Sequence, residues 1–331
     1  MNQIHNKSGI VFFACLNLFL IFLNPLYAQK KVEKEKNSIL GEGLALYTII
    51  LANWTSNDLY YESEFNTNIV SGYLSYKDKD SIKTIFWRDI DTSSAEYKAK
   101  TFQQVADTGA IAAQHSTKIT GLQVITKTFR YEKMNVSKKN AKIVEDERAP
   151  TDYEKMLMDF RKATYDTIKK DTAFFTEYQG TALKAVPMDA GKKILVYIYS
   201  SSTSEEFVPL GGDYTILYGK KEKDVIERKK LHDRIILIST HYKGKPSDAT
   251  KFTYHYHKGD SPELITPTDV ATLLLYKTSV DWDEHRVISD SYVCVFTLVD
   301  RKLQLIPAKE YDRMNKKKEA QDKNEQNSNF H

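Results

Sequence analysis

Cysteine is scarce in this sequence, and its scarcity excludes a fold held together by disulfides. Only two of the 331 residues are cysteines. Cys15 lies in an apolar N-terminal stretch that we expect to be removed, which leaves Cys294 as the one thiol of the remaining chain. Cys294 lies in the alternating run "SYVCVFTLV", and this pattern predicts a buried thiol with a structural role.

An excess of charge of one sign is also missing. The 48 basic and 44 acidic residues give a formal net charge of +4, and they are spread in mixed runs. Nucleic-acid binding requires basic residues gathered on one face, so the sequence predicts no nucleic-acid partner. The chain has only 13 glycines but 21 tyrosines and 15 phenylalanines, a composition that favours a sheet-rich globular protein.

Long apolar runs are confined to the N-terminus. Lys7 precedes an apolar run over residues 9–23, and a small residue, Ala28, ends the stretch before a charged segment. This order predicts a signal peptide over residues 1–28, cleaved after Ala28. The alternatives are an uncleaved anchor, although Asn17 interrupts a run already short for a bilayer, and a lipid anchor on the cysteine of the run.

The same absences suggest where the protein acts. No later segment is long and apolar enough to span a membrane, so we expect no membrane span after signal cleavage. An exported protein without disulfides fits the bacterial periplasm or surface better than a eukaryotic secretory route. We therefore expect a periplasmic or secreted bacterial protein.

Residue periodicity predicts a smaller N-terminal region over residues 29–149. Apolar residues at helical spacing predict a helix over residues 43–54. Two alternating runs around the turn "KDKDS" predict a β-hairpin over residues 70–88, and "GLQVITKTFRYEK" predicts a further strand. The charged stretch over residues 138–150 is expected to be a domain boundary or a long surface loop.

The C-terminal part has the pattern of an α+β domain. Thr151 and Glu154 form a capping-box pattern at the start of an amphipathic helix. Strand patterns follow along the rest of the chain, and one helix, "TPTDVATLLLYK", interrupts them. This order predicts an α+β domain over residues 150–312 with few helices and a mixed, mostly antiparallel sheet. Residues 313–331 have few apolar side chains and are expected to be a disordered polar tail.

One stretch of this domain carries a candidate metal site. If "KFTYHYHK" is a strand, His255 and His257 point to the same face, because side chains alternate along a strand. Asp269 would begin the following helix, where its carboxylate could return to the strand end as a third ligand. Two histidines, one aspartate and a water would form an open tetrahedral zinc site.

Each of these residues also has a structural explanation. His255 and His257 could line the solvent face of their strand. Thr266 could be the N-cap of the helix, with Asp269 closing a capping box, which explains the aspartate without a metal. His232, among arginines and lysines at a strand end, is interpreted as solvated.

The order of strand with His-x-His, loop, Thr-x-x-Asp at a helix start, and apolar strand resembles the JAMM/MPN family of zinc metalloproteases and isopeptidases. The resemblance covers roughly residues 150–310 and implies a JAMM/MPN-like fold. It implies that His255, His257 and Asp269 bind zinc. It also implies that Thr266 occupies the place of a serine that helps hold the oxyanion.

The sequence departs from the family pattern in three places. Eleven residues instead of ten separate His257 from Asp269, Lys258 stands where the family has proline, and threonine replaces the serine. The family's catalytic glutamate has no obvious counterpart, and the upstream options are Glu206, Glu205 and Glu177. His241 is a further potential ligand.

The sequence therefore predicts an exported protein with a zinc-dependent peptidase or amidase domain of the cell envelope. Its metal ligands would be His255, His257 and Asp269, with Thr266 and Glu206 in catalytic roles. The alternative is a non-catalytic binding or structural module of the envelope with a degenerate fold of this type. In either case the expected partner is an unidentified envelope protein, peptide or glycan.

Overall fold

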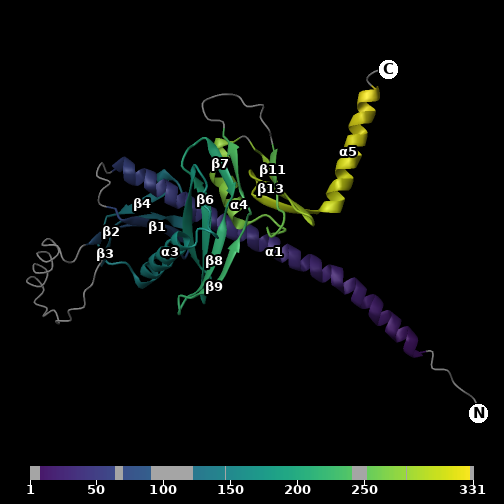
Figure 1. Cartoon of the computed structure of the whole chain (residues 1–331), viewed down its shortest axis with the longest axis horizontal. Coiled ribbons are helices and arrows are strands. Elements are labelled where there is room, and N and C mark those ends of the chain that lie inside the picture. Colours follow the sequence, from purple (N-terminus) through teal and green to yellow (C-terminus); the bar gives the residue numbers. More distant parts are fainter. Residues whose placement is uncertain are drawn as a thin grey trace, which may run out of the picture.

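The computed structural model shows three groups of strands arranged along one long helix (Figure 1). It describes residues 8–63, 70–90, 122–145, 147–240, 252–280 and 282–328. Within these ranges, side chains are described from residue 30 to residue 321, except that of Leu122.

Helix α1 (Ser8–Ser63) is the longest element and runs past all three groups of strands (Figure 1). It includes the helix predicted over residues 43–54 and extends it in both directions. Leu46, Ile49 and Ile50 bury its inner face among the strands. Cleavage of the predicted signal peptide remains a prediction. None of the helices in the described part of the chain has the length and apolarity that a bilayer crossing requires.

An antiparallel sheet with the order β1-β2-β3-β4 covers the C-terminal half of α1. Its strands are β1 (Gly72–Asp78), β2 (Ser81–Ile90), β3 (Leu122–Tyr131) and β4 (Ala141–Val144). The predicted hairpin and the predicted third strand are confirmed. Short 3-10 turns at Glu132–Met134 and Lys138–Asn140 lead into β4.

Strand β4 corrects the expectation that the charged stretch is only a loop or boundary. It pairs with β3, from Tyr131 opposite Ala141 to Thr128 opposite Val144. Most of its side chains are exposed, so the strand depends on backbone pairing at the sheet edge. An exposed edge strand needs no apolar alternation, and the sequence pattern therefore gives no signal for it.

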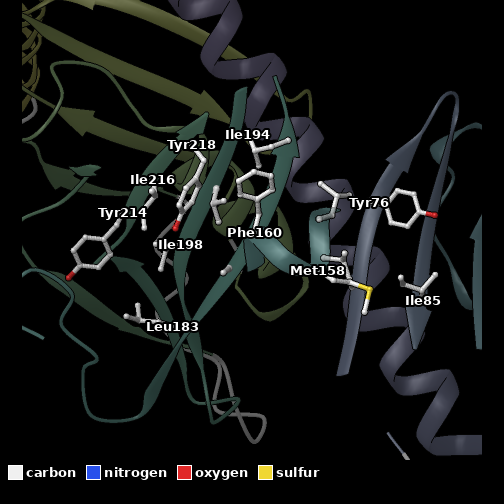
Figure 2. Close-up of a cluster of buried hydrophobic side chains, with 14 of the residues drawn as sticks. Tyr76, Ile85, Met158, Phe160, Leu183, Ile194, Ile198, Tyr214, Ile216 and Tyr218 are labelled. Carbon is white, nitrogen blue, oxygen red and sulfur yellow. The ribbon is translucent and has the colours of Figure 1, made fainter. Parts of the chain in front are cut away.

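Helix α3 (Asp152–Lys170) begins at the capping box predicted for it. The Thr151 hydroxyl accepts from the Glu154 amide, and the Glu154 carboxylate accepts from the Thr151 amide. Met158 and Phe160 project from this helix between the sheet of β1 and β2 and the next sheet (Figure 2). Side chains from both sides of the predicted boundary at residue 149 thus share one buried cluster.

The second sheet has the antiparallel order β5-β6-β8-β9. Its strands are β5 (Thr181–Asp189), β6 (Lys193–Ser202), β8 (Tyr214–Gly219) and β9 (Val225–Lys230). Beside it, β7 (Phe207–Gly211) pairs with β10 (Ile235–Ser239). The sequence pattern predicted these strands except β7, which is short and follows a polar Ser/Glu run.

The third sheet has the order β11-β12-β13-β14. Its strands are β11 (Phe252–Tyr256), β12 (Glu284–Ile288), β13 (Tyr292–Thr297) and β14 (Lys302–Pro307). Between β11 and β12 lie α4 (Pro267–Leu275) and a 3-10 turn, Lys277–Ser279. β11 and β12 are parallel, whereas all other pairs of described strands are antiparallel. The predicted α+β class with mostly antiparallel sheets is confirmed.

The C-terminal segment corrects a second expectation. Helix α5 (Ala308–Ser328) occupies most of the stretch that was predicted to be disordered, and it projects away from the sheets (Figure 1). Its side chains from Ala308 to Gln321 are almost all exposed. The run is rich in lysine, glutamate, glutamine and alanine, which favour helix even where no apolar face is buried.

Candidate metal centre

The β11-α4-β12 unit places two histidines at the C-terminal end of a strand. His255 lies in β11 and His257 follows it directly, and each is only 3% exposed. Tyr254 and Tyr256, on the opposite face, are about half exposed, at 50% and 54%. The predicted common face of the histidines is therefore confirmed, and the interpretation that they line a solvent face is wrong.

Asp269 lies at the third position of α4, and its two oxygens have different surroundings. Oδ2 accepts from the Thr266 amide at 2.9 Å and from the Thr266 hydroxyl at 2.8 Å, while the Asp269 amide donates back to that hydroxyl. Oδ1 has no hydrogen-bond partner. The capping box is thus present, and it leaves one carboxylate oxygen free to face the histidines.

A close helix contact holds α4 in place. An ideal Cβ on Gly43 of α1 would lie 2.6 Å from the Cβ of Val270, the residue after Asp269. Any larger side chain would push α4 away from α1, so this glycine permits the approach that positions the carboxylate.

A third histidine, His232, joins the group from the connection between β9 and β10. Its Nε2 lies 3.1 Å from Asp269 Oδ1 and 3.0 Å from His257 Nε2, and its side chain is 6% exposed. The interpretation of His232 as solvated is wrong. The charged neighbours are exposed, but Leu231 is buried beside it and carries the histidine inward.

The double glycine at the end of β7 makes room for His232. Gly211 has a positive φ of 81°, and a Cβ there would lie 2.5 Å from the Arg234 carbonyl oxygen and 3.2 Å from the His232 Cβ. The sequence shows these glycines only as a turn. Their close approach to the β9–β10 connection joins residues about 20 positions apart, so no local pattern in the sequence could indicate that His232 belongs to the site.

We refer to His232, His255, His257 and Asp269 as the His/Asp cluster. One potential ligand atom from each residue lies within 4.8 Å of all the others. His257 Nε2 is 3.0 Å from His255 Nε2 and 3.8 Å from Asp269 Oδ2, and His255 Nε2 is 3.9 Å from Asp269 Oδ1. Zinc bonds of 2.0–2.1 Å in a tetrahedron separate the ligand atoms by about 3.3 Å, so the observed spacings bracket that value.

The outer ring nitrogens of two histidines have partners, and the partner of His257 fixes which of its nitrogens faces the centre. His257 Nδ1 lies 2.7 Å from the Pro262 carbonyl oxygen, which can only accept, so Nδ1 carries the hydrogen and Nε2 has a free lone pair. His255 Nδ1 lies 2.8 Å from Nε2 of the buried His285 on β12. Metal-binding histidines generally have such an outer partner, which orients the ring.

The outer nitrogen of the third histidine, His232, lies near the carboxylate of Asp213. His232 Nδ1 lies 3.7 Å from Asp213 Oδ2, and Asp213 Oδ1 accepts from the Ser200 amide at 3.0 Å. Burial raises the pKa of Asp213 to about 7. Among the described residues, six buried side-chain atoms have no hydrogen-bond partner. Three of the six lie in or beside the His/Asp cluster: Asp269 Oδ1, His232 Nδ1 and His285 Nδ1.

Burial sets the charge of the centre. It lowers the pKa of His255 to about 4 and that of His285 to about 3, and it also lowers the pKa of His257. These imidazoles are neutral near pH 7, the form that binds a metal. Burial opposes ionisation of Asp269, but His232 and His255 hold its pKa well below the usual range. Burial also opposes protonation of His232, but Asp269 outweighs it and raises the pKa of His232.

A pocket of about 360 Å³ gives access to this centre. His232 and His255 form part of its wall, together with Asp233, Arg234 and Lys258. Ligand pockets commonly have volumes of about 300–1,000 Å³. A small molecule in this pocket would therefore lie directly beside two of the potential metal ligands.

The other residues predicted for the site lie elsewhere. Thr266 is buried and bonded to Asp269, and it does not line the pocket. Glu206 and Glu205 are exposed before β7, and Glu177 accepts from the Leu183 amide. His241 lies outside the described residues.

Comparison with known proteins adds no family or relative. No protein-family model, curated protein or solved structure matches the chain.

Proposed function

We propose that the His/Asp cluster binds one zinc ion and that the protein is a zinc-dependent hydrolase of amide bonds. The observation that carries this proposal is the convergence of three imidazoles and one carboxylate, with one potential ligand atom from each within 4.8 Å of all the others. Zinc prefers nitrogen, sulfur and oxygen ligands in a tetrahedron, whereas magnesium and calcium prefer oxygen ligands alone. Three imidazoles therefore favour zinc over either of the harder ions.

The adjoining pocket supports a catalytic role. Zinc bound beside it would polarise a carbonyl group and lower the pKa of a bound water. Of the described residues that line the pocket, only Asp233 carries a carboxylate, and we assign it as the general base. Arg234 and Lys258 supply positive charge that would attract an anionic group of the substrate.

The resemblance to JAMM/MPN peptidases supports an amide as the substrate bond. His255, His257 and Asp269 are the ligands that the resemblance implies, and His232 is an addition to them. The hydroxyl of Thr266 is engaged by Asp269, so we assign it a positioning role instead of contact with the oxyanion.

A structural zinc site is the second candidate. The cluster offers four protein ligands, the number that closes a structural zinc site, whereas catalytic sites keep one position open. In this case the ion would fasten the β9–β10 connection to β11 and α4, and the chain would be a binding or structural module.

His232→Ala separates the two candidates. A hydrolase retains zinc on His255, His257 and Asp269, and still cleaves a panel of fluorogenic peptide amides. A structural site loses its zinc and its thermal stability together. In the hydrolase, Asp233→Asn keeps the zinc and slows turnover by about 10²–10⁴-fold. A zinc-loaded wild-type protein with no turnover, and a His232→Ala variant without zinc, would contradict the hydrolase proposal.

We further propose that this activity lies outside the cytoplasm, in the bacterial envelope. The support is the order of charged, apolar and small residues over residues 1–28, which is typical of a signal peptide. The partner would then be an envelope protein or peptide.

A further inference from the structure

A second and larger pocket lies away from the metal centre, where the end of α1 meets the ends of β6 and α4. Its volume is about 860 Å³, and it shares no lining residue with the pocket at the His/Asp cluster. We call it the hydroxyl pocket. It is lined by Leu51, Trp54, Thr55, Asp58, Ser201, Ser202, Thr203, Ser204, Glu205, Thr240, Leu275, Tyr276, Thr278, Ser279 and Val280.

Two aromatic rings form one part of this pocket. Trp54 and Tyr276 meet edge to face, with ring centroids 5.4 Å apart, and both side chains are only partly buried. Their π faces are electron-rich and attract weakly positive C–H groups. A flat, partly apolar ligand with C–H groups on one face fits such a pair of rings.

Serine and threonine hydroxyls form much of the rest of the wall. Two hydrogen bonds order the loop after β6. The Ser202 hydroxyl donates to the Ser204 carbonyl oxygen, and the hydroxyl of Thr240, which follows β10, donates to the Glu205 carbonyl oxygen. The hydroxyls of Thr55 and Thr278 form no hydrogen bond within the described part of the chain. The pocket thus combines an ordered loop with two hydroxyls, those of Thr55 and Thr278, that can donate to and accept from a ligand.

The charge of the wall excludes anionic ligands. Asp58 and Glu205 contribute carboxylates, and no lysine, arginine or histidine is among the described lining residues. Lys138 lies 3.6 Å from Asp58 and offsets part of its charge. A phosphate or carboxylate ligand would meet net repulsion, whereas the hydroxyl groups of a neutral ligand could donate to both carboxylates.

We infer that the hydroxyl pocket binds a saccharide. Among small ligands, a sugar ring combines an apolar C–H face for Trp54 and Tyr276 with several neutral hydroxyls for the serines, threonines and carboxylates. The volume accommodates more than a single ring. This site is independent of the metal centre and adds carbohydrate binding to the proposed hydrolase.

Trp54 provides a local reporter for the test. Of the three tryptophans, Trp87 and Trp282 are buried, at 7% and 8% exposure, and lie outside the pocket lining, whereas Trp54 is partly exposed within it. The zinc-loaded protein and the chelator-treated protein are each titrated with chitotetraose, cellotetraose, maltotetraose and mannotetraose. Tryptophan emission and calorimetry are recorded in parallel.

We expect a saturable emission change with at least one tetrasaccharide, of equal size with and without zinc. Trp54→Phe removes the emission change while calorimetry still detects binding, and Trp54→Ala weakens binding by about tenfold. Thr278→Lys, at an exposed wall position, blocks binding without lowering the melting temperature. The matched control, Trp282→Phe, leaves the response intact.

Several results would overturn the inference. They are a flat response to all four sugars at millimolar concentration, a response that Trp282→Phe removes but Trp54→Phe retains, and saturable binding of spermidine but of no sugar. The last result would identify the pocket as a site for cations. None of these outcomes bears on zinc binding, so the two proposals fail separately.

Discussion

Two buried polar clusters in this protein differ in how completely they satisfy themselves. The first surrounds Glu154, whose carboxylate accepts from Arg148 at 2.7 and 2.8 Å, from the Tyr76 hydroxyl at 2.7 Å and from the Thr151 amide at 2.8 Å. The second is the His/Asp cluster, where Asp269 Oδ1 accepts no hydrogen bond of good geometry and has only the Nε2 atom of His232 near it at 3.1 Å, and where three imidazole Nε2 atoms converge.

This difference separates a structural cluster from a binding site. The charge of Glu154 is balanced by Arg148, and both of its carboxylate oxygens accept hydrogen bonds from the protein. This cluster therefore leaves no group for a ligand to bind. Buried polar groups without partners are costly, and a protein that retains several of them in one place commonly uses them to bind something. The His/Asp cluster could hold one metal ion between its four side chains.

The largest effect is expected at the structural cluster. Glu154→Ala leaves the Arg148 charge without its main partner and should lower the free energy of unfolding by about 3–5 kcal/mol. Denaturant titration measures this loss, which should be equal with and without zinc. Glu222→Ala, at an exposed site, is the control. A loss of stability confined to the zinc-loaded protein would show that the Glu154 cluster is not independent of the metal centre.

Acid should weaken the same cluster. Burial opposes ionisation of Glu154, but Arg148, the Thr151 amide and Tyr76 lower its pKa from 4.5 to about 2. A carboxyl whose pKa is lower in the folded state stabilises the fold above its unfolded pKa and loses that contribution as the pH falls. Unfolding followed between pH 6 and pH 2 should therefore show Glu154-dependent stability that fades below about pH 4.5. A wild-type minus Glu154→Gln difference independent of pH would contradict this account.

Zinc should act only on the other cluster. At a free zinc concentration one hundred times the dissociation constant, binding should stabilise the fold by about 2.7 kcal/mol. Asp269→Asn keeps the side-chain volume and an oxygen for the Thr266 cap, but loses the charge, so this stabilisation should disappear. Thermal melts with added zinc or chelator measure it. Equal stabilisation of the wild type and the variant would place the zinc elsewhere.

The partner behind His255 should have a smaller effect. His285→Phe removes the imidazole whose Nε2 lies 2.8 Å from His255 Nδ1 and orients the His255 ring, and it should weaken zinc binding by about 10–100-fold. Competition with a chromogenic chelator measures this affinity. The variant should still bind one zinc per chain, because none of the four potential ligands is changed. An unaltered affinity would show that His285 only fills space.

The smallest effect is expected at the helix cap. Thr266→Ala removes an N-cap hydroxyl and should cost about 1 kcal/mol of stability. If Thr266 only positions Asp269, zinc-dependent turnover should fall by about 10–100-fold at most, and Thr266→Ser should restore both turnover and stability. A loss of turnover by several orders of magnitude at unchanged zinc content would restore the oxyanion role that the family resemblance implies.

Local patterns in the sequence predicted much of this arrangement. The alternation around His255 and His257 predicted their shared face, and the spacing from Thr266 to Asp269 predicted the cap. The metal and cap explanations of Asp269 were posed as alternatives, but they do not exclude each other, because Oδ2 forms the cap while Oδ1 faces His232.

Non-local features were beyond the sequence. His232 reaches the centre only because Gly211 lets two backbones approach across separate strands, and no local spacing encodes that contact. Strand β7 follows a polar loop, and β4 is an exposed edge strand, so neither shows the alternation of a buried strand. Pairing across the chain forms both of them.

The most direct test of the central claim is the zinc content of the purified, refolded protein after dialysis against zinc and then against metal-free buffer. Elemental analysis should find one zinc per chain in the wild type and none in Asp269→Asn, with both proteins folded by circular dichroism. A folded wild-type protein that holds no zinc would contradict the claim that the His/Asp cluster is a metal centre.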